Sequence, residues 1–273
     1  MNIQQLLLMN SDIEAELLLP AAIGQTKEFL FVEPYYELTP KQLSTFLKFA
    51  KLRRQGKPIA YVLGTQPFFD LDLKVNPSVL IPRPETEWLA AKAKQLAQKL
   101  VRPRIIDVGT GSGAIAIFLA TKLKGKALIC ASDISIKALT VAKANAEHFK
   151  LKSQIKFYHT SLLDKIPGKF DIIVANLPYV PISDYKKLKN NLKFEPKSAI
   201  TDGTDNSKLI LELLDQSLKK LTPKGKVLLE IDPSSVEHIE AWAEHIKPLY
   251  QVKLEFYQDL KHLNRYAIIK SST

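Results

Sequence analysis

The feature that most constrains the fold is an alternation of strand-like and helical segments after residue 85. Short apolar runs are separated by stretches whose apolar residues recur every three or four positions, and these runs span residues 104–108, 127–131, 155–158, 170–175 and 227–231. Strands that alternate with helices imply a parallel sheet. Two further runs, 252–256 and 266–269, follow without a long helix between them. This predicts an antiparallel hairpin at one edge, and therefore a seven-stranded, mostly parallel α/β sheet.

The first third of the chain has a different pattern. Over residues 2–51 the apolar residues recur at helical spacing, which predicts a small bundle of short helices. Thr39 followed by Pro40 is typical of a helix start, because the hydroxyl caps the helix and proline suits its first position. Residues 56–84 instead alternate between apolar and polar side chains, which predicts a linking β-hairpin. We therefore predict three segments: a helical domain over 1–66, a hairpin linker over 67–84 and an α/β domain over 85–273.

Composition limits the surroundings and partners of the chain. The longest apolar stretches fall well short of the roughly 20 residues that a membrane-spanning helix needs, and the N-terminus lacks the basic region of a signal peptide. We expect a cytoplasmic monomer with no membrane contact. The 39 Lys and Arg against 28 Asp and Glu give a net charge of +11, which is compatible with weak nucleic-acid contact through a basic surface.

A glycine-rich turn lies between the strand-like run 104–108 and an apolar helical pattern. Gly109, Gly111 and Gly113 follow the spacing Gly-x-Gly-x-Gly. Glycine allows the backbone to approach a ligand closely. Dinucleotide sites use Gly-x-Gly-x-x-Gly with the pyrophosphate on a helix N-terminus, so the third glycine here comes too early for NAD. The turn favours a cofactor without phosphates.

Two carboxylates accompany the turn. Asp107 precedes the glycines, and Asp133 closes the next predicted strand about 20 residues after them. At that distance a carboxylate is placed to hold a ribose hydroxyl pair. The alternative for Asp133 is a structural one, in which it caps a helix over residues 135–148.

The strand-like run 170–175 is followed by Asn176-Leu177-Pro178-Tyr179. An amide-like nitrogen is a poor nucleophile, because its lone pair is delocalised, and it must be oriented by acceptors for its two N–H bonds. The Asn176 oxygen and the Leu177 carbonyl are suited to that role, while Pro178 fixes the backbone and Tyr179 offers a flat face. The segment therefore predicts transfer to a planar NH₂ group; the alternative is a strand-ending turn that happens to contain proline.

The motifs resemble those of a broad class of enzymes, and the chain as a whole resembles one family within that class. The glycine turn with Asp133 resembles the class I, Rossmann-like methyltransferases, and the tetrapeptide resembles the Asn-Pro-Pro-Tyr signature of methyltransferases acting on exocyclic amino groups and glutamine amides. The chain as a whole resembles the release-factor glutamine methyltransferases, through the segments 57–64, 68–69, 75–76, 80–87, 194–196, 202–203 and 228–231. It departs from that family at Leu177, where proline is usual, and at Ser161, where an acidic residue is usual.

This resemblance implies an S-adenosylmethionine-dependent enzyme without a metal, whose substrate is the glutamine in the Gly-Gly-Gln motif of peptide chain release factors. It implies that the helical domain helps to hold the release factor. The cofactor-binding residues implied are Gly109, Thr110, Gly111, Ser112, Gly113, Asp133, Ser161, Leu162 and Asn176. The catalytic residues implied are Asn176, Leu177, Pro178 and Tyr179, and the same four bind the substrate together with Arg83 and Glu85. The alternative for Arg83 and Glu85 is a surface turn with an ion pair.

Other functions stay open from the sequence alone. The Asn-Leu-Pro-Tyr form also resembles the rRNA adenine dimethyltransferases, so an rRNA or DNA adenine-N6 methyltransferase is the main rival. Those dimethyltransferases place their extra domain after the catalytic one, whereas here it comes first. A non-catalytic protein with the same fold that binds RNA or a ribosomal factor is the third possibility.

Overall fold

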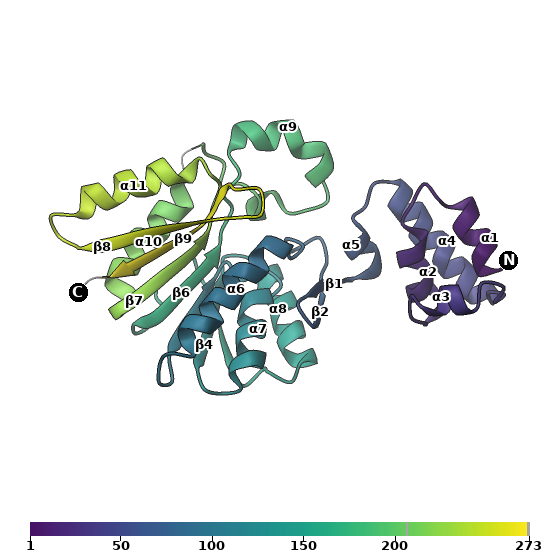
Figure 1. Cartoon of the computed structure of the whole chain (residues 1–273), viewed down its shortest axis with the longest axis horizontal. Helices are drawn as coiled ribbons and strands as arrows, with labels where there is room; N and C mark the ends of the chain where they lie inside the picture. The colour runs from purple at the N-terminus through teal and green to yellow at the C-terminus, as the bar shows by residue number, and fades with distance from the viewer. Residues whose placement is uncertain (206, 272–273) are drawn as a thin grey trace. The chain divides into compact units, whose positions relative to one another are not determined.

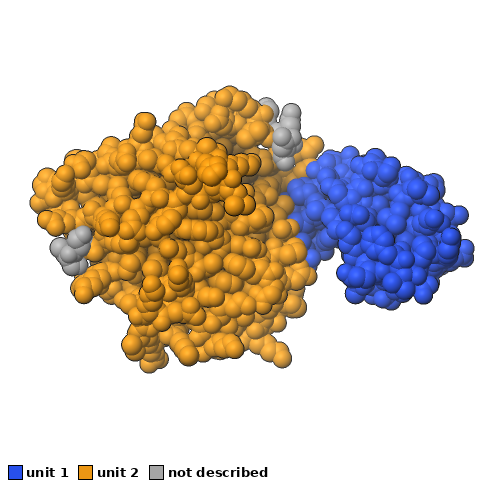
Figure 2. Space-filling model, viewed as in Figure 1, with its two compact units in different colours: residues 1–65 blue, residues 66–273 orange. Residues whose placement is uncertain are grey.

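The structure is a computed structural model that describes residues 1–205 and 207–271. It divides into two compact units, Met1–Thr65 and Gln66–Thr273, which are coloured separately in Figure 2. Each unit has its own hydrophobic core. The boundaries of the three segments predicted from the sequence, at residues 66 and 84, stay predictions.

The first unit is a bundle of short helices, as predicted (Figure 1). Its helices are α1 (Ile3–Met9), α2 (Ala15–Ile23), α3 (Phe29–Val32), α4 (Pro40–Arg54) and α5 (Ile59–Leu63). The predicted helix start at Thr39 is confirmed: its hydroxyl accepts from the Gln42 backbone N–H, and the Gln42 side chain accepts from the Thr39 N–H. This reciprocal pair satisfies two backbone donors that a helix start would otherwise leave open.

The predicted hairpin starts at the boundary between the two units and is formed by β1 (Thr65–Phe68) and β2 (Leu71–Lys74). Residues 75–83 then run as a loop to helix α6 (Pro84–Ala97). Asn145 of helix α8 (Ile136–His148) is fully buried and holds β2 in place, because its side chain exchanges two hydrogen bonds with the Lys74 backbone at 2.8 and 2.9 Å. The same amide donates to the Ser112 carbonyl, so it also ties the hairpin to the glycine turn.

The predicted seven-stranded sheet is confirmed, with the order β5-β4-β3-β6-β7-β9-β8. Its strands are β3 (Arg104–Val108), β4 (Leu128–Asp133), β5 (Ile155–His159), β6 (Phe170–Asn176), β7 (Leu221–Glu230), β8 (Val252–Gln258) and β9 (Asn264–Ser271). The first five are parallel, and β9 pairs antiparallel with both β7 and β8. Strand β7 begins earlier than its apolar run suggests, because Leu221 pairs with Phe170 before a register shift caused by the intervening Thr-Pro-Lys-Gly segment.

Helices cover both faces of the sheet (Figure 1). α6 (Pro84–Ala97), α7 (Ala114–Leu123) and α8 (Ile136–His148) lie on one side, and α10 (Lys208–Lys220) and α11 (Ser235–Ile246) lie on the other. Helix α9 (Ile182–Leu192) and the short 3₁₀ helix η1 (Lys197–Ala199) belong to the connection between β6 and α10. Side chains alternate along each strand, so Ile172 and Val174 of β6 pack with the α6 and α7 side, whereas Ile173 and Ala175 pack with the α10 and α11 side. By the same alternation Asn176 belongs to the α6 face.

None of the helices in residues 1–205 and 207–271 combines the length and the apolar composition needed to cross a bilayer.

Candidate active site at the carboxyl edge of the sheet

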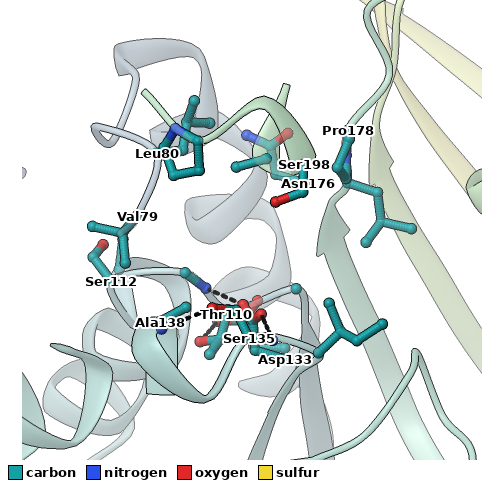
Figure 3. Close-up of a pocket in the computed structure, with 18 of the residues that line it drawn as sticks. Val79, Leu80, Thr110, Ser112, Asp133, Ser135, Ala138, Asn176, Pro178 and Ser198 are labelled. Carbon is teal, nitrogen blue, oxygen red and sulfur yellow. Dashed lines mark hydrogen bonds between the residues drawn. The ribbon is translucent and has the colours of Figure 1, made fainter. Parts of the chain in front are cut away.

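A cavity in the second unit lies where β3, β4 and β6 end. Open α/β sheets bind ligands at this edge, because the loops that follow adjacent strands diverge there. In Figure 3, Thr110, Ser135 and Asp133 lie on one side of the cavity, and Asn176 and Pro178 lie on the other. The residues that line it are Ser78, Val79, Leu80, Pro82, Arg83, Thr86, Asp107, Gly109, Thr110, Gly111, Ser112, Ala114, Ile115, Asp133, Ile134, Ser135, Ala138, Ser161, Leu162, Asn176, Leu177, Pro178, Pro196, Ser198, Ala199 and Leu209.

The glycine turn needs its glycines for two different reasons. Gly109 has φ +70°, and a Cβ there would lie 3.0 Å from Leu177 Cδ2. Gly113 has φ +87°, and a Cβ would lie 2.9 Å from Ile117 Cδ1 and 3.3 Å from Ala142 Cβ. Gly109 therefore permits a backbone turn beside the Asn176 segment, whereas Gly113 permits close packing between α7 and α8.

Asp107 anchors the turn from inside. Its side chain is buried, and its Oδ2 accepts from the Thr110 hydroxyl at 2.6 Å and from the Ala116 backbone N–H at 3.1 Å. Burial raises the pKa of this carboxyl to about 7, against the lowering effect of both hydrogen bonds. The carboxyl thus links the start of the turn to the first turn of α7.

Asp133 lies at the end of β4 on the cavity wall. Its two oxygens accept from the Gly111 and Ser135 backbone N–H groups at 2.9 and 2.8 Å. Burial raises its pKa, and the two backbone donors oppose the increase. Helix α8 is capped by Ser135, whose hydroxyl accepts from the Ala138 N–H, so the alternative in which Asp133 caps that helix is wrong. Because each carboxylate oxygen has further lone pairs, Asp133 retains capacity to accept from a diol.

Asn176 is the first member of a hydrogen-bond chain. Its Nδ2 donates to the Thr86 hydroxyl at 2.8 Å, and that hydroxyl donates to Glu230 Oε2 at 2.8 Å. The Tyr179 hydroxyl donates to Glu230 Oε1 at 2.8 Å. Burial raises the pKa of both Glu230 and Tyr179, and the neighbouring carboxylate raises that of the tyrosine further. In the part of the chain that the structure describes, no donor reaches Asn176 Oδ1.

Arg83 pairs with a carboxylate that is distant in the sequence. Its guanidinium donates to Glu195 Oε1 at 2.6 Å, and Glu195 Oε2 accepts from the Ile81 backbone N–H. The Glu195 side chain is only 4% exposed, whereas that of Arg83 is 36% exposed. The predicted alternative of a turn stabilised by an ion pair is therefore half right: the pair exists, but it links the loop before α6 to the segment before η1.

The structure brings most of the predicted site residues together on the cavity wall. The cavity includes Gly109, Thr110, Gly111, Ser112, Asp133, Ser161, Leu162, Asn176, Leu177, Pro178 and Arg83. Three others are not among the described lining residues. Gly113 lies behind the turn in the α7–α8 contact, Glu85 is exposed in the first turn of α6, and the Tyr179 ring packs against the core on the α10 and α11 side.

Sequence reasoning gave no role to Thr86, Glu195 or Glu230, although all three lie inside the segments that carry the family resemblance. Each is buried and hydrogen-bonded to another segment. Only Glu230 has a sequence signal, as a charged residue directly after an apolar run, whereas Thr86 and Glu195 lie among other polar residues. That signal cannot identify partners that lie 144 positions apart in the case of Thr86 and Glu230.

Comparison with known families agrees with this geometry. The family described as "Methyltransferase small domain" matches residues 89–193, and "PrmC N-terminal domain" matches residues 5–64. Among solved structures, a ribosomal protein L11 methylase from Lactobacillus delbrueckii subsp. bulgaricus is similar with a TM-score of 0.51 and 26% identity, over 75% of this chain and 88% of that one. The sheet and its helices therefore have the class I methyltransferase fold.

Two curated relatives extend the similarity to most of the chain. A release factor glutamine methyltransferase from Koribacter versatilis is 39% identical over 230 residues, which cover 83% of this chain and 81% of the relative. The enzyme of the same description from Rhodopirellula baltica is 35% identical over 230 residues, covering 81% of this chain and 77% of the relative. With this identity over most of its length, and with the glycine turn and Asn176 on one cavity wall, the chain belongs to the release factor glutamine methyltransferase family.

Proposed function

We infer that this protein transfers a methyl group from S-adenosylmethionine to the side-chain amide nitrogen of the glutamine in the Gly-Gly-Gln motif of peptide chain release factors, and so modulates translation termination. The observation that carries this inference is the placement of Asn176 opposite Asp133 and the glycine turn, in a chain of this family. The cavity thus has a side suited to the cofactor and a side suited to an amide.

The cofactor side fits S-adenosylmethionine by its chemistry. Asp133 is an acceptor on the wall, as a ribose diol requires, and Leu162 and Ala138 provide apolar surface nearby. When bound, the cofactor supplies an electrophilic methyl group on a sulfonium centre. We propose the cofactor-binding set given by the sequence, with Gly113 acting through the packing of α7 on α8.

The acceptor side orients the nucleophile. The Asn176 Oδ1 and the Leu177 carbonyl accept the two N–H bonds of the glutamine amide, which directs its lone pair toward the cofactor side. Holding the reacting nitrogen about 3 to 3.5 Å from its target supplies much of the acceleration, so no general base is required. We propose that Pro178 fixes this turn. Tyr179 stays a proposed contact for the flat face of the amide, and Arg83 and Glu85 stay proposed contacts for the release factor.

A transfer assay with labelled S-adenosylmethionine tests the function. We expect the native chain to label a release factor, and a Gln→Ala change in the substrate's Gly-Gly-Gln motif to abolish that label. Asn176→Ala is expected to lower the rate by about 10³-fold or more, since orientation of the amide is lost. Label that appears on rRNA or DNA and not on the release factor would favour the adenine-N6 alternative, and label on neither would favour a binding protein.

The remaining expectations concern partners and surroundings. We propose that residues 1–66 help to hold the release factor, that the chain is a cytoplasmic monomer, and that its charge of +11 permits weak nucleic-acid contact. Light scattering tests the monomer. The salt dependence of RNA binding tests the last point, because phosphate contacts weaken steeply as salt increases.

A further inference from the structure

We propose that Thr86 and Glu230 are positioning residues that lock the Asn176 amide in one orientation, with its NH₂ toward Thr86 and its Oδ1 toward the substrate amide. This proposal rests on the proposed function. It adds two residues that lie outside the Asn-Leu-Pro-Tyr motif. The supporting observation is the continuous chain of hydrogen bonds from Asn176 through Thr86 to Glu230.

The sheet places the two ends of this chain together. Asn176 and Glu230 are register partners on the adjacent strands β6 and β7, and both are the last residue of their strand. Alternation puts Glu230 on the same face as Leu228, which packs on the α6 side, as Asn176 does. Thr86 comes from the first turn of α6, which packs against both strands, and its hydroxyl bridges the two side chains.

The bridge has a direction because a hydroxyl has a single proton. A carboxylate only accepts, so the Thr86 proton is directed to Glu230. The Thr86 oxygen can then only accept a hydrogen bond from Asn176, and the NH₂ group is the only donor on that side chain. A flipped Asn176 would set its carbonyl oxygen against these lone pairs and leave its N–H donors facing the N–H donors of the substrate.

The surroundings of Glu230 supply donors to both of its oxygens. Burial raises its pKa, and the donors Thr86 and Tyr179, together with the positive charge of Arg265, act in the opposite direction. Glu85 and Tyr266 also face this carboxyl; Glu85 adds to the increase, and the Tyr266 hydroxyl donates to the Glu85 carbonyl. The geometry sets the direction: both oxygens of Glu230 accept, Oε1 from the Tyr179 hydroxyl and Oε2 from the Thr86 hydroxyl, so the Thr86 proton lies on the Glu230 side.

Substitution of Thr86 tests the lock. Thr86→Val preserves shape but removes the hydroxyl, and we expect it to lower the single-turnover rate of methyl transfer by 10- to 100-fold while the Kd for S-adenosylmethionine changes less than threefold. Thr86→Ser restores the hydroxyl and is expected to recover most of the rate. Thr121→Val is the matched control, because the Thr121 hydroxyl on α7 has no hydrogen-bond partner among the described residues. A Thr86→Val rate within twofold of native overturns the proposal.

Substitution of Glu230 tests the direction. Glu230→Gln keeps the size of the side chain but can present an NH₂ group to Thr86, which frees the Thr86 proton to point at Asn176. We expect at least a tenfold decrease in the transfer rate, with near-native cofactor binding. A native rate in this variant overturns the role given to the carboxylate.

A measurement that does not depend on catalysis separates this proposal from the proposed function. In protein labelled with ¹⁵N-asparagine, the Asn176 NH₂ signal is assigned by its disappearance in Asn176→Asp. We expect one of its protons to be protected from solvent exchange in the native chain and in Thr86→Ser, and at least tenfold less protected in Thr86→Val. Equal protection in all three overturns the lock. If the native chain labels no release factor but this protection pattern holds, the proposed function fails and the lock stands.

Discussion

Asp107 and Glu230 are two carboxyl groups at or near the same sheet edge, and each residue is 1% exposed. They differ in how far along the sequence their hydrogen-bond donors lie. Asp107 accepts from Thr110 and Ala116, three and nine residues away. Glu230 accepts from Tyr179 and Thr86, which lie 51 and 144 residues away. The proposed cofactor side of the cavity is therefore built mainly from neighbours in sequence, and the proposed acceptor side is assembled from remote segments.

Because of this difference, we expect substitutions on the two sides to affect different properties of the protein. A local carboxylate such as Asp107 stabilises a turn that nearby residues already favour. A remote one such as Glu230 is satisfied only when α6, β6 and β7 are packed together. Substitutions on the cofactor side should therefore alter stability and cofactor affinity, whereas those on the acceptor side should alter the transfer rate.

The largest effect is expected from the charge of Asp107. Because its folded-state pKa of about 7 lies above the ordinary value of 3.8, the folded chain retains a proton that the unfolded chain releases. The stabilisation of the folded chain by this proton is fully present below pH 3.8 and is lost as the pH rises to about 7. Asp107→Asn cannot titrate, so the native chain should lose at most about 4 kcal/mol of unfolding free energy relative to the variant over this range.

Urea unfolding of both chains at several pH values measures this loss. Asn still offers an oxygen to Thr110 and Ala116, so the variant is expected to fold. Parallel stability curves for the two chains would contradict the buried, locally anchored acid described above.

Asp133 is the cofactor-side residue expected to have the largest effect on binding. Asp133→Ala removes the proposed acceptor for the ribose hydroxyls, and we expect the Kd for S-adenosylmethionine to increase about 100-fold, because two hydrogen bonds to a charged group would be lost. Calorimetric titration measures it. Asp133→Asn retains one acceptor oxygen, so its Kd should lie between those of the native chain and Asp133→Ala. A Kd within threefold of native for Asp133→Ala would remove the ribose role.

The contact between Gly109 and Leu177 joins the two sides and gives an intermediate effect. Gly109→Ala puts a side chain at φ +70° and 3.0 Å from Leu177 Cδ2, so we expect about tenfold weaker cofactor binding. The further change Leu177→Ala provides space but leaves the backbone strain, and should recover only part of the affinity. A double-mutant cycle measures the coupling. Strict additivity would show that the two sides do not communicate through this contact.

The smallest effect is expected at the cap of α8. Ser135→Ala removes the acceptor for the Ala138 N–H and should lower the unfolding free energy by about 1 kcal/mol. Thr39→Ala, at the cap of α4 in the first unit, provides a comparison of similar size. Thermal unfolding checks both. A loss above about 3 kcal/mol at Ser135 would mean that its cavity wall position, and not capping, dominates.

The sequence predicted the elements with strong local patterns. The succession of strands and helices along the chain, the terminal antiparallel hairpin and the Thr39 helix start follow from periodicity and from contacts within a few residues, and all are confirmed. Strand β7 was underestimated, because Pro223 and Gly225 interrupt its apolar pattern and only the pairing of Leu221 with Phe170 reveals its start. Its boundary depends on the neighbouring strand.

By itself the sequence determined the glycine turn, the position of Asp133 after it and the Asn176 segment, because each is a short motif whose backbone geometry is encoded locally. Only the tertiary structure decided that Arg83 pairs with Glu195 and that Thr86 joins Asn176 to Glu230. The physical reason is that a buried polar group must find a partner, but its identity depends on which remote segments the packed sheet and helices bring within about 3 Å.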